Sequence, residues 1–356
     1  MDYEGRVARV RETLPDVDAL LVTNLTNVRY LTGFSGTNGQ LLVTRAHAVF
    51  MTDPRYEARA GDLVKGADVS VYPAAVTDVL GELLSRDDVT RLGVEAATMT
   101  LSERDDLHER LEEVALVPTK GVVERLRRVK DAGEIAALRR AIALGDRAYE
   151  VVLDRLVPGA TERDIALELE VFIRNEGADH ISFDPIVGSG PLSAHIHHTP
   201  SARPFEKGDL VLLDFGSRID GYCSDLTRTV VLGPATDEQR AIYDTVLESN
   251  RAGIAALAPG APCADVDRAA RAVIADAGHG EHFGHGLGHG VGLDIHESPR
   301  LHRVSEESLL AGDVVTIEPG IYVPGAGGIR IEDCVLVTED GPEVLTRAPK
   351  DTLTEL

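Results

Sequence analysis

Short apolar runs of strand type alternate with charged, helix-like stretches along the first third of the chain. The expected strands, rich in branched aliphatic side chains, are Val17–Val22, Gln40–Thr44, His47–Met51, Val69–Tyr72 and Leu92–Glu95. Turn residues such as Gly36–Gly39 separate them, and Ser102–Glu113 is a charged segment with leucines at helical spacing. The pattern predicts an α/β domain, and no catalytic constellation is visible in it.

Longer helical periodicities follow. Ile135–Leu156 has apolar residues at steps of three and four and ends at Pro158-Gly159, which is typical of a helix and its stop signal. Thr161-Glu-Arg-Asp164 resembles a capping box ahead of the next helix. Further expected elements are a helix over Ile165–Ile173, a strand over Ile181–Val187, and helices over Thr236–Leu257 and Cys263–Ala277. This part of the chain is therefore predicted to consist of two related halves, each of helices followed by strands.

One strand motif occurs in both halves. Gly208–Gly216 reads Gly-Asp, four apolar residues, and then Asp214-Phe-Gly. Gly312–Gly320 repeats this order with mostly apolar residues and ends in Glu318-Pro-Gly. The repetition indicates an internal duplication.

A second carboxylate follows each copy of the motif on another strand-like run. Asp225 follows the first copy and Glu332 the second. Burying a carboxylate at the end of an apolar strand costs free energy unless a positive charge neutralises it. Four acids placed in this way predict a pocket that holds metal ions.

Histidines accompany the acids in the same order. Ile196-His197-His-Thr-Pro200 precedes the first copy, and Ile295-His296-Glu-Ser-Pro299 precedes the second. Two pseudo-equivalent halves that face each other would bring both histidines and all four acids around one cleft.

The stretch Phe283–Gly292 carries His285 and His289 among five glycines. A His-x-x-x-His pair on a helix suggests a zinc peptidase, but no Glu follows the first His and the glycines disfavour a helix. We expect an extended or looped backbone that approaches closely to something.

Four carboxylates and one or two imidazoles, with no thiolate, suit Mn²⁺, Fe²⁺, Co²⁺ or Zn²⁺. This donor set is too large for one catalytic zinc, yet it fits two divalent ions roughly 3.5–4 Å apart. Such a pair acidifies a shared water to hydroxide and stabilises the oxyanion of a tetrahedral intermediate. The reaction type is metal-assisted hydrolysis of an amide or a phosphate ester, and the acid-rich, lysine-poor pocket favours the amide.

The composition argues against several classes of partner and of site. The net charge of −23 argues against a nucleic-acid partner, because phosphate binding needs a basic face. The three cysteines, Cys223, Cys263 and Cys334, are widely spaced and suggest neither a disulfide framework nor a thiolate zinc site. The start of the chain lacks a signal-type apolar core, and no apolar run approaches the roughly 18 residues of a membrane span. We expect a cytoplasmic protein with no membrane partner.

Five motifs together resemble the Xaa-Pro branch, prolidase and aminopeptidase P, of the pita-bread metallopeptidases. They are Leu213–Gly216, Ser224–Thr229, His285–Glu297, Thr316–Gly320 and Gly328–Asp333. Near the amino terminus, Thr26–Phe34 and Thr52–Tyr56 are similar to the creatinase-like domain of that branch. The resemblance covers the whole chain.

The resemblance implies a role for each ligand. Asp214 would chelate the first metal alone, Asp225 and Glu332 would bridge the pair, and His289 and Glu318 would complete the second metal. Glu318 would also exchange protons with the attacking hydroxide and the leaving amine.

The resemblance also assigns the substrate side. His285, His296 and His197 match histidines that hold the scissile carbonyl and the intermediate, and Arg330 would orient a bridging carboxylate. Many relatives read Ser-Ala-Leu-Pro-His where this chain has Ser193-Ala-His195-Ile-His197-His198, so His195 and His198 compete with His197 for this position.

The implied fold is a creatinase-like N-terminal α/β domain over residues 1–122, a connection over 123–133, and a pita-bread catalytic domain over 134–356. The expected function is hydrolysis of the bond between an N-terminal residue and a following proline, by a hydroxide bridging two divalent ions. Mn²⁺ is the first choice of metal, with Co²⁺, Zn²⁺ or Fe²⁺ as alternatives. The expected substrate is a small peptide with proline at the second position, and a homodimer is expected on base rates. Methionine aminopeptidase-like hydrolysis and a non-catalytic binding module remain alternatives.

Overall fold

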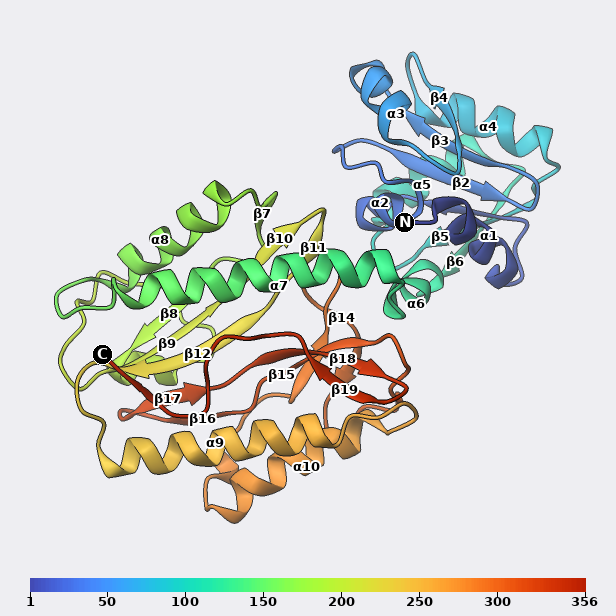
Figure 1. Cartoon of the computed structure of the whole chain (residues 1–356). Coiled ribbons are helices and arrows are strands. Elements are labelled where there is room, and N and C mark those ends of the chain that lie inside the picture. Colours follow the sequence, from blue (N-terminus) through green and yellow to red (C-terminus); the bar gives the residue numbers. More distant parts are fainter. The chain divides into compact units, whose positions relative to one another are not determined.

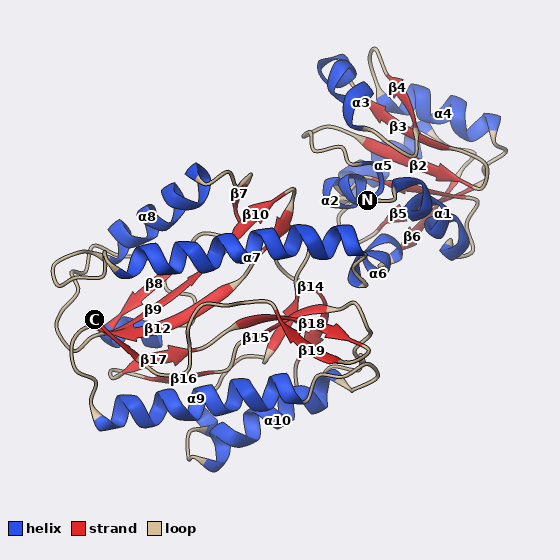
Figure 2. Ribbon diagram, in the orientation of Figure 1, coloured by secondary structure: helices blue, strands red, loops and turns tan.

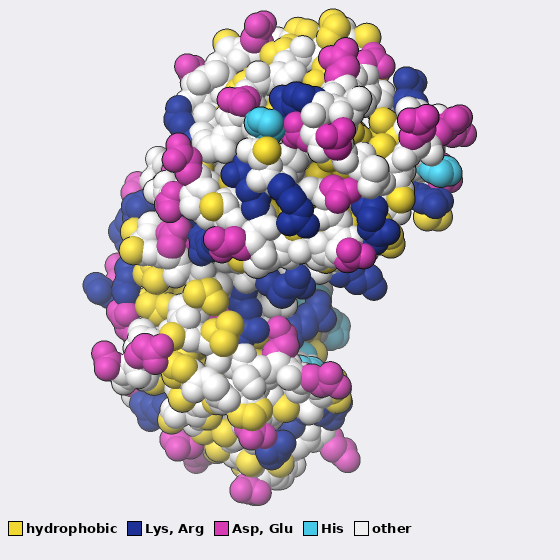
Figure 3. All heavy atoms as spheres, turned by 90° about the vertical axis from the view of Figure 1, so that its right-hand side faces the viewer, with side chains coloured by type: hydrophobic (Ala, Val, Ile, Leu, Met, Phe, Trp, Pro, Cys, Tyr) yellow, Lys and Arg dark blue, Asp and Glu magenta, His cyan; other side chains and the backbone are white.

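The computed structural model describes residues 1–356, which form two compact units, Met1–Arg127 and Arg128–Leu356. Each unit has its own sheets and its own hydrophobic core. Figure 1 shows the order of the elements along the chain. No helix combines the length and the hydropathy that a membrane-spanning segment needs. On the face of the molecule drawn in Figure 3, acidic side chains are interspersed with basic and hydrophobic ones.

The Met1–Arg127 unit is built on a six-stranded mixed sheet in the order β4-β3-β2-β1-β5-β6. Its strands are β1 (Ala19–Val22), β2 (Gln40–Thr44), β3 (Ala48–Thr52), β4 (Asp68–Val71), β5 (Arg91–Glu95) and β6 (Ala115–Thr119). Around it lie α1 (Tyr3–Thr13), α2 (Leu25–Thr32), η1 (Pro54–Tyr56), α3 (Glu57–Leu63), α4 (Val76–Arg86), α5 (Leu101–Arg110) and α6 (Val122–Arg128), as Figure 2 shows. Leucines of α4 and α5 pack with strand residues in one core. The expected α/β domain is confirmed, and β6 is a strand that the sequence analysis missed.

The first half of the Arg128–Leu356 unit joins two helices to a four-stranded sheet. The helices are α7 (Ala132–Leu153) and α8 (Glu162–Asn175), and the sheet order is β20-β12-β9-β8. Its strands are β8 (Ile186–Ser189), β9 (Leu210–Phe215), β12 (Leu226–Val231) and β20 (Thr354–Glu355). A separate three-stranded sheet has the order β11-β10-β7 and consists of β7 (His180–Ile181), β10 (Ser217–Ile219) and β11 (Tyr222–Cys223). The short helix η2 (Gly190–Ala194) follows β8.

The second half repeats this plan with α9 (Asp237–Ala255) and α10 (Cys263–Asp276). Its five-stranded sheet has the order β14-β13-β15-β18-β19, and β16 pairs with β17. The elements are η3 (Gly280–His282), β13 (Gly288–Gly290), β14 (Glu297–Leu301), β15 (Val314–Ile317), β16 (Gly320–Val323), β17 (Gly327–Arg330), β18 (Asp333–Thr338) and β19 (Gly341–Val344). Figure 1 shows α7 and α8 on one side of the strands of this unit and α9 and α10 on the other.

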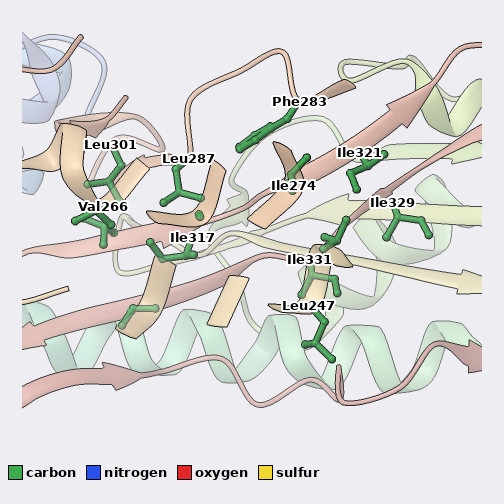
Figure 4. Packing of buried hydrophobic residues seen from close by; sticks show 14 of the residues in the cluster. Leu247, Val266, Ile274, Phe283, Leu287, Leu301, Ile317, Ile321, Ile329 and Ile331 are labelled. Carbon is green, nitrogen blue, oxygen red and sulfur yellow. The ribbon is translucent and has the colours of Figure 1, made fainter. Parts of the chain in front are cut away.

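Each half has its own apolar cluster between its helices and its strands. In the first half, α7 and α8 contribute Leu144, Ile165 and Leu169, which pack with Val211 and Leu213 of β9. Figure 4 shows the second-half cluster, in which Leu247 and Val266 of α9 and α10 lie near Ile317 and Ile331. Burial of these branched side chains fixes the strands that carry the acids, because a strand with one face in the core cannot slip in register.

Backbone contacts recur at matching points of the two halves. Thr161 forms an isolated antiparallel bridge with Pro204, and Pro262 forms one with Ser308. Both bridges tie the start of a helix, α8 or α10, to the segment that precedes the Gly-Asp strand motif. The two copies of the motif therefore begin in equivalent surroundings.

One expected strand differs from the structure. Ile181–Val187 was expected to be continuous, but β7 ends at Ile181 and β8 begins at Ile186. Pro185 lies in the break and has no backbone N–H for a ladder hydrogen bond. The expected helices over Ile135–Leu156, Ile165–Ile173, Thr236–Leu257 and Cys263–Ala277 are confirmed with small shifts of their ends.

Candidate metal centre

A cavity of about 1080 Å³ lies within the Arg128–Leu356 unit and collects the residues singled out in the sequence. All four acids of the duplicated motifs line it, together with the four histidines and the arginine that the resemblance assigned: Asp214, Asp225, Glu318, Glu332, His197, His285, His289, His296 and Arg330. His198, His302 and Arg300 also line it. Apolar side chains, among them Phe183 and Ile186, line another part of its wall.

Strand pairing brings the acids of each half together. Asp214 lies on β9 directly opposite Thr227 of β12, and Asp225 is the residue before β12. In the second half, Glu318 follows β15 and Glu332 precedes β18, its antiparallel partner. In each half, the first acid lies at the end of one strand of a pair and the second acid directly before the other strand.

Ligand atoms from both halves converge in this cavity. Atoms of Asp225, His289 and Glu332 all lie within 4.8 Å of one another. The Nε2 atom of His289 is 3.6 Å from Oδ2 of Asp225 and 3.5 Å from Oε1 of Glu318. Such spacing leaves room for a cation between the groups.

The carboxylates destabilise one another when no cation is present. Burial, followed by repulsion from Glu332, Asp214 and Glu318, raises the pKa of Asp225 well above its ordinary value. Burial, followed by Glu318 and Asp214, does the same to the pKa of Glu332. Burial also raises the pKa of Glu318 to about 7. The arrangement is electrostatically costly as it stands, and divalent ions would relieve it.

Asp214 offers a second sign that the cavity suits a cation. Its Oδ2 accepts a hydrogen bond from Arg330, but its buried Oδ1 has no hydrogen-bond partner. Buried polar atoms without a partner are rare and indicate an ion or water. The residues present therefore fit a divalent metal site.

His289 is presented in the form that a metal requires. Its Nδ1 lies 3.1 Å from the carbonyl oxygen of Gly290, so this nitrogen carries the proton and donates it. The lone pair of Nε2 then points toward the oxygens of Asp225 and Glu318. Burial, followed by the charge of His296, lowers the pKa of His289 to about 4, which keeps the imidazole neutral.

Arg330 supports two of the acids from one position on β17. Its guanidinium donates to Asp214 and, over 3.0 Å, to the hydroxyl of Thr227, which in turn donates to Oε2 of Glu332 over 2.6 Å. The third contact of Arg330 is the hydroxyl of Tyr322 at 2.9 Å. These hydrogen bonds connect Arg330 to Glu332 through Thr227.

The hydroxyl of Tyr322 also contacts His285. The Tyr322 hydroxyl lies 2.9 Å from Nε2 of His285, while Nδ1 of His285 donates to the carbonyl of Gly286 over 2.8 Å. Nε2 is therefore the acceptor and the hydroxyl of Tyr322 the donor. Burial, followed by Arg330, lowers the pKa of His285 to about 3, so a neutral imidazole faces the cavity.

The remaining histidines differ in their surroundings. The ring of His296 lies 4.4 Å from that of His289, and burial lowers its pKa. His197 and His198 line the cavity, but His195 does not. The Nε2 atom of His198 is 2.8 Å from Glu162, whereas the imidazole of His197 has no hydrogen bond. His197 is thus the histidine of this segment with a ring available to a substrate.

Two residues of this network, Thr227 and Tyr322, were not assigned a role from the sequence. Thr227 lies on β12 two residues after Asp225, and Tyr322 lies on β16 four residues after Glu318, but neither acid belongs to the strand that follows it. The period of two along a strand therefore gives no signal for either residue. Their hydrogen-bond partners come from other segments of the chain.

The chain matches two family models. Residues 136–339 match metallopeptidase family M24, and residues 6–129 match the creatinase/prolidase N-terminal domain.

Similar proteins cover nearly the full length. An Xaa-Pro dipeptidase of Pyrococcus furiosus is 34% identical over 337 residues, which are 95% of each chain. A solved structure of an Xaa-Pro dipeptidase from Bacillus anthracis is 39% identical, covers 99% of this chain and 100% of its own, and superposes with a TM-score of 0.97. An X-Pro aminopeptidase from Thermotoga maritima is 33% identical, with a TM-score of 0.92 over 97% of this chain and 99% of its own.

Proposed function

Because this chain belongs to metallopeptidase family M24, with a creatinase/prolidase N-terminal domain, we propose that it hydrolyses the peptide bond between an N-terminal residue and a following proline. Full-length similarity to proteins described as Xaa-Pro dipeptidases and as an X-Pro aminopeptidase supports this substrate class. The observation that carries the proposal is the convergence of three buried carboxylates, the partly buried Glu318 and a neutral His289 in one cavity.

The metal content is proposed on the same donors. Asp214 would hold the first divalent ion, Asp225 and Glu332 would be shared by both ions, and His289 and Glu318 would complete the second. Bound ions supply positive charge that lowers the pKa of water and stabilises a developing oxyanion. Mn²⁺ is proposed first, with Co²⁺, Zn²⁺ or Fe²⁺ as alternatives, because the oxygen-rich set with one imidazole does not select a soft metal.

The protein's own residues then have separate tasks. Glu318 would take the proton of the attacking water and return it to the leaving nitrogen, which in proline carries no N–H of its own. His285, His296 and His197 would hold the scissile carbonyl and the intermediate. Both ring nitrogens of His285 have partners, the carbonyl of Gly286 and the hydroxyl of Tyr322, so His285 would exchange one of these partners when it contacts the substrate.

The cavity wall offers a surface suited to proline. Phe183, Pro185, Ile186 and Ile196 line it, and a saturated ring can pack against these apolar groups without leaving a polar group unpaired. A volume of about 1080 Å³ accommodates a small peptide. This size fits a dipeptide and also a somewhat longer chain, so both the dipeptidase and the aminopeptidase P activity are retained.

The proposal extends to the oligomeric state, the location and the domain bounds. We propose a homodimer, the commonest oligomer of soluble proteins, and a cytoplasmic location, which suits three buried cysteines that form no disulfide. We place the domains at 1–122 and 134–356, joined by 123–133.

The test is hydrolysis by the metal-loaded protein. Purified protein is incubated with Mn²⁺ or Co²⁺ and offered Ala-Pro, Ala-Pro-Ala and Met-Ala, with a chelator-treated sample as the control. Cleavage of Ala-Pro alone indicates a dipeptidase, and cleavage of Ala-Pro-Ala indicates an aminopeptidase P. Cleavage of Met-Ala alone, or turnover of none of the three, would contradict the proposal.

A further inference from the structure

A fully buried carboxylate lies outside the cavity but beside the segment that carries His197. Glu162 is the first residue of α8, and its side chain has no exposed surface. It does not line the cavity, and the hydrolysis proposed above gives it no task. A buried acid at this place needs a physical reason, because its desolvation costs free energy.

Five donors surround this carboxylate. Its Oε1 accepts from the backbone N–H of Ser189 over 2.8 Å and from the hydroxyl of Ser189 over 2.7 Å. Its Oε2 accepts from the N–H of Ser201 over 2.9 Å, from the hydroxyl of Ser201 over 2.6 Å, and from Nε2 of His198 at 2.8 Å. One side chain thus joins the end of β8 to two points just after His197.

The acid is held in its charged form. Burial alone would raise the pKa of Glu162, but the hydrogen bonds from Ser201, Ser189 and His198 outweigh it and bring the pKa below its ordinary value. A carboxylate can only accept hydrogen bonds, so Nε2 of His198 is the donor. Hydrogen bonds to a charged group are roughly twice as strong as neutral ones, which makes this a firm anchor.

His197 depends on such an anchor. Its side chain is exposed and makes no hydrogen bond, so only the backbone of its segment sets its direction. On the carboxyl side, His198 and Ser201 are tied to Glu162. On the amino side, the hydroxyl of Ser193 accepts from the N–H of Gly328 over 2.8 Å. The segment is therefore fixed at both ends.

The second half shows that a helix start at this point does not itself require an acid. Cys263, the first residue of α10, donates its backbone N–H to the backbone carbonyl of Glu307. In the same way, Glu162 donates its backbone N–H to the backbone carbonyl of Arg203. The helix–segment junction is the same in both halves, yet only the first half has a carboxylate there. Glu162 therefore serves something particular to the first half.

We propose that Glu162 is a positioning residue that holds His197 toward the cavity through His198 and Ser201, an inference that rests on the proposed function. The test compares Glu162→Gln with wild type as the metal-loaded enzyme on Ala-Pro. Gln keeps the size but loses the charge and faces the donors with an N–H₂ group. We expect kcat/KM to fall roughly 10- to 100-fold, because misplacing a catalytic group by about 1 Å costs up to about 100-fold. Bound metal, measured by elemental analysis, should not change.

A second variant separates positioning from a general structural role. His197→Ala removes the group that Glu162 is proposed to position. In the His197→Ala background, adding Glu162→Gln should lower kcat/KM by less than about a further 3-fold, because two changes that act through one residue are not additive. If the two losses multiply, the proposal is wrong. Full activity of Glu162→Gln would also overturn it.

Two further variants serve as a control and as a milder alternative to Glu162→Gln. Glu168→Gln changes an exposed glutamate on the same helix and should leave kcat/KM unchanged. If Glu162→Gln does not fold, Ser201→Ala removes only one donor, and its smaller loss should likewise vanish in the His197→Ala background. Multiplying losses for Ser201→Ala would again contradict the proposal.

Hydrogen–deuterium exchange tests the anchoring by Glu162 independently of enzyme activity. Glu162→Gln should speed exchange of the backbone amides of residues 195–201 and leave those of β9 unchanged. Unchanged exchange over 195–201 would overturn the inference even in an active enzyme. Absence of peptide hydrolysis by wild type would instead count against the proposed function, with the exchange result still deciding on Glu162.

Discussion

The two halves of the Arg128–Leu356 unit place their acids in the same way but hold their histidine segments differently. In the first half, His198 follows His197 and is bound to buried Glu162. In the second half, Glu297 follows His296, and its carboxylate lies 3.3 Å from Nζ of buried Lys130.

The places of the acid and of its partner are thus exchanged between the two anchors. In one half the acid is on the helix and its partner on the segment, and in the other the acid is on the segment and its partner precedes α7. The acids that face the cavity occupy equivalent places because all of them line one cavity. The anchors behind the histidines need only fix a backbone, so any buried complementary pair suffices.

The largest expected effect comes from Asp225, an acid of the first half whose carboxylate lies near His289 and Glu332 of the second half. Asp225→Asn should abolish turnover and lower the bound metal, because the proposed bridging role needs both charged oxygens. The comparison is with Asp244→Asn, an exposed residue on α9, which should behave as wild type. Full activity of Asp225→Asn would reject its role between the halves.

The glycines that end the two motifs should differ in their response to alanine. A Cβ at Gly216 would lie 1.9 Å from the backbone oxygen of Ser224, whereas at Gly320 it would meet the hydroxyl of Tyr322 at 2.5 Å. Gly216→Ala forces a backbone shift, and we expect it to cost about 1–3 kcal/mol of unfolding free energy or more.

Gly320→Ala should act mainly on activity, because moving the Tyr322 hydroxyl breaks its contact with His285. Thermal unfolding and kcat/KM of both variants make the comparison, with Gly61→Ala as a control that meets no neighbour within 4 Å. Equal melting temperatures for Gly216→Ala and Gly320→Ala would show that the two halves are more alike than the contacts suggest.

The second-half anchor can be broken at its lysine. Lys130→Met leaves the carboxylate of Glu297 buried with less compensation, and removing one partner of a buried pair costs about 3–5 kcal/mol. Urea unfolding measures this loss. Adding Glu297→Gln should recover much of it, since the charge that needed Lys130 is then gone. A double variant as unstable as Lys130→Met would show that packing, and not charge, made the contact important.

The first-half anchor has the smallest expected effect, seen in its pH dependence. The pKa of Glu162 is below its ordinary value of 4.5 in the folded protein, so its contribution to stability is full above pH 4.5 and is lost as pH falls through the folded pKa. The gap in unfolding free energy between wild type and Glu162→Gln should therefore stay constant from pH 7 to about pH 5 and narrow below. Glu168→Gln should show no gap. If the gap in unfolding free energy between wild type and Glu162→Gln has already closed above pH 5, the pKa of Glu162 is not lowered in the folded protein.

Several elements follow directly from the sequence pattern. The helices over 135–156 and 236–257 have long apolar periodicities, and their ends carry Pro-Gly or a capping Thr. The duplicated Gly-Asp strand motif marked β9 and β15. The Ile181–Val187 strand was mispredicted because one proline outweighed an otherwise apolar run, and β6 was missed because its alternation is weak and includes Pro118.

The candidate site was predictable in its residue types but not in its contacts. The sequence marked Asp214, Asp225, Glu318 and Glu332 because buried acids at strand ends are costly and stand out. It could not show that Oδ1 of Asp214 lacks a partner, or that Thr227 links Arg330 to Glu332. Those facts depend on which strands lie side by side.

The sequence by itself determined the α/β class, the two related halves and the set of acids and histidines, because periodicity and motif order are local properties of the chain. Only the tertiary structure decided that His197 and His198 line the cavity while His195 does not. It also joined Glu162 of α8 to His198 and to Ser189 of β8. Hydrogen bonds between distant elements have no periodic signature, so the sequence pattern could not reveal them.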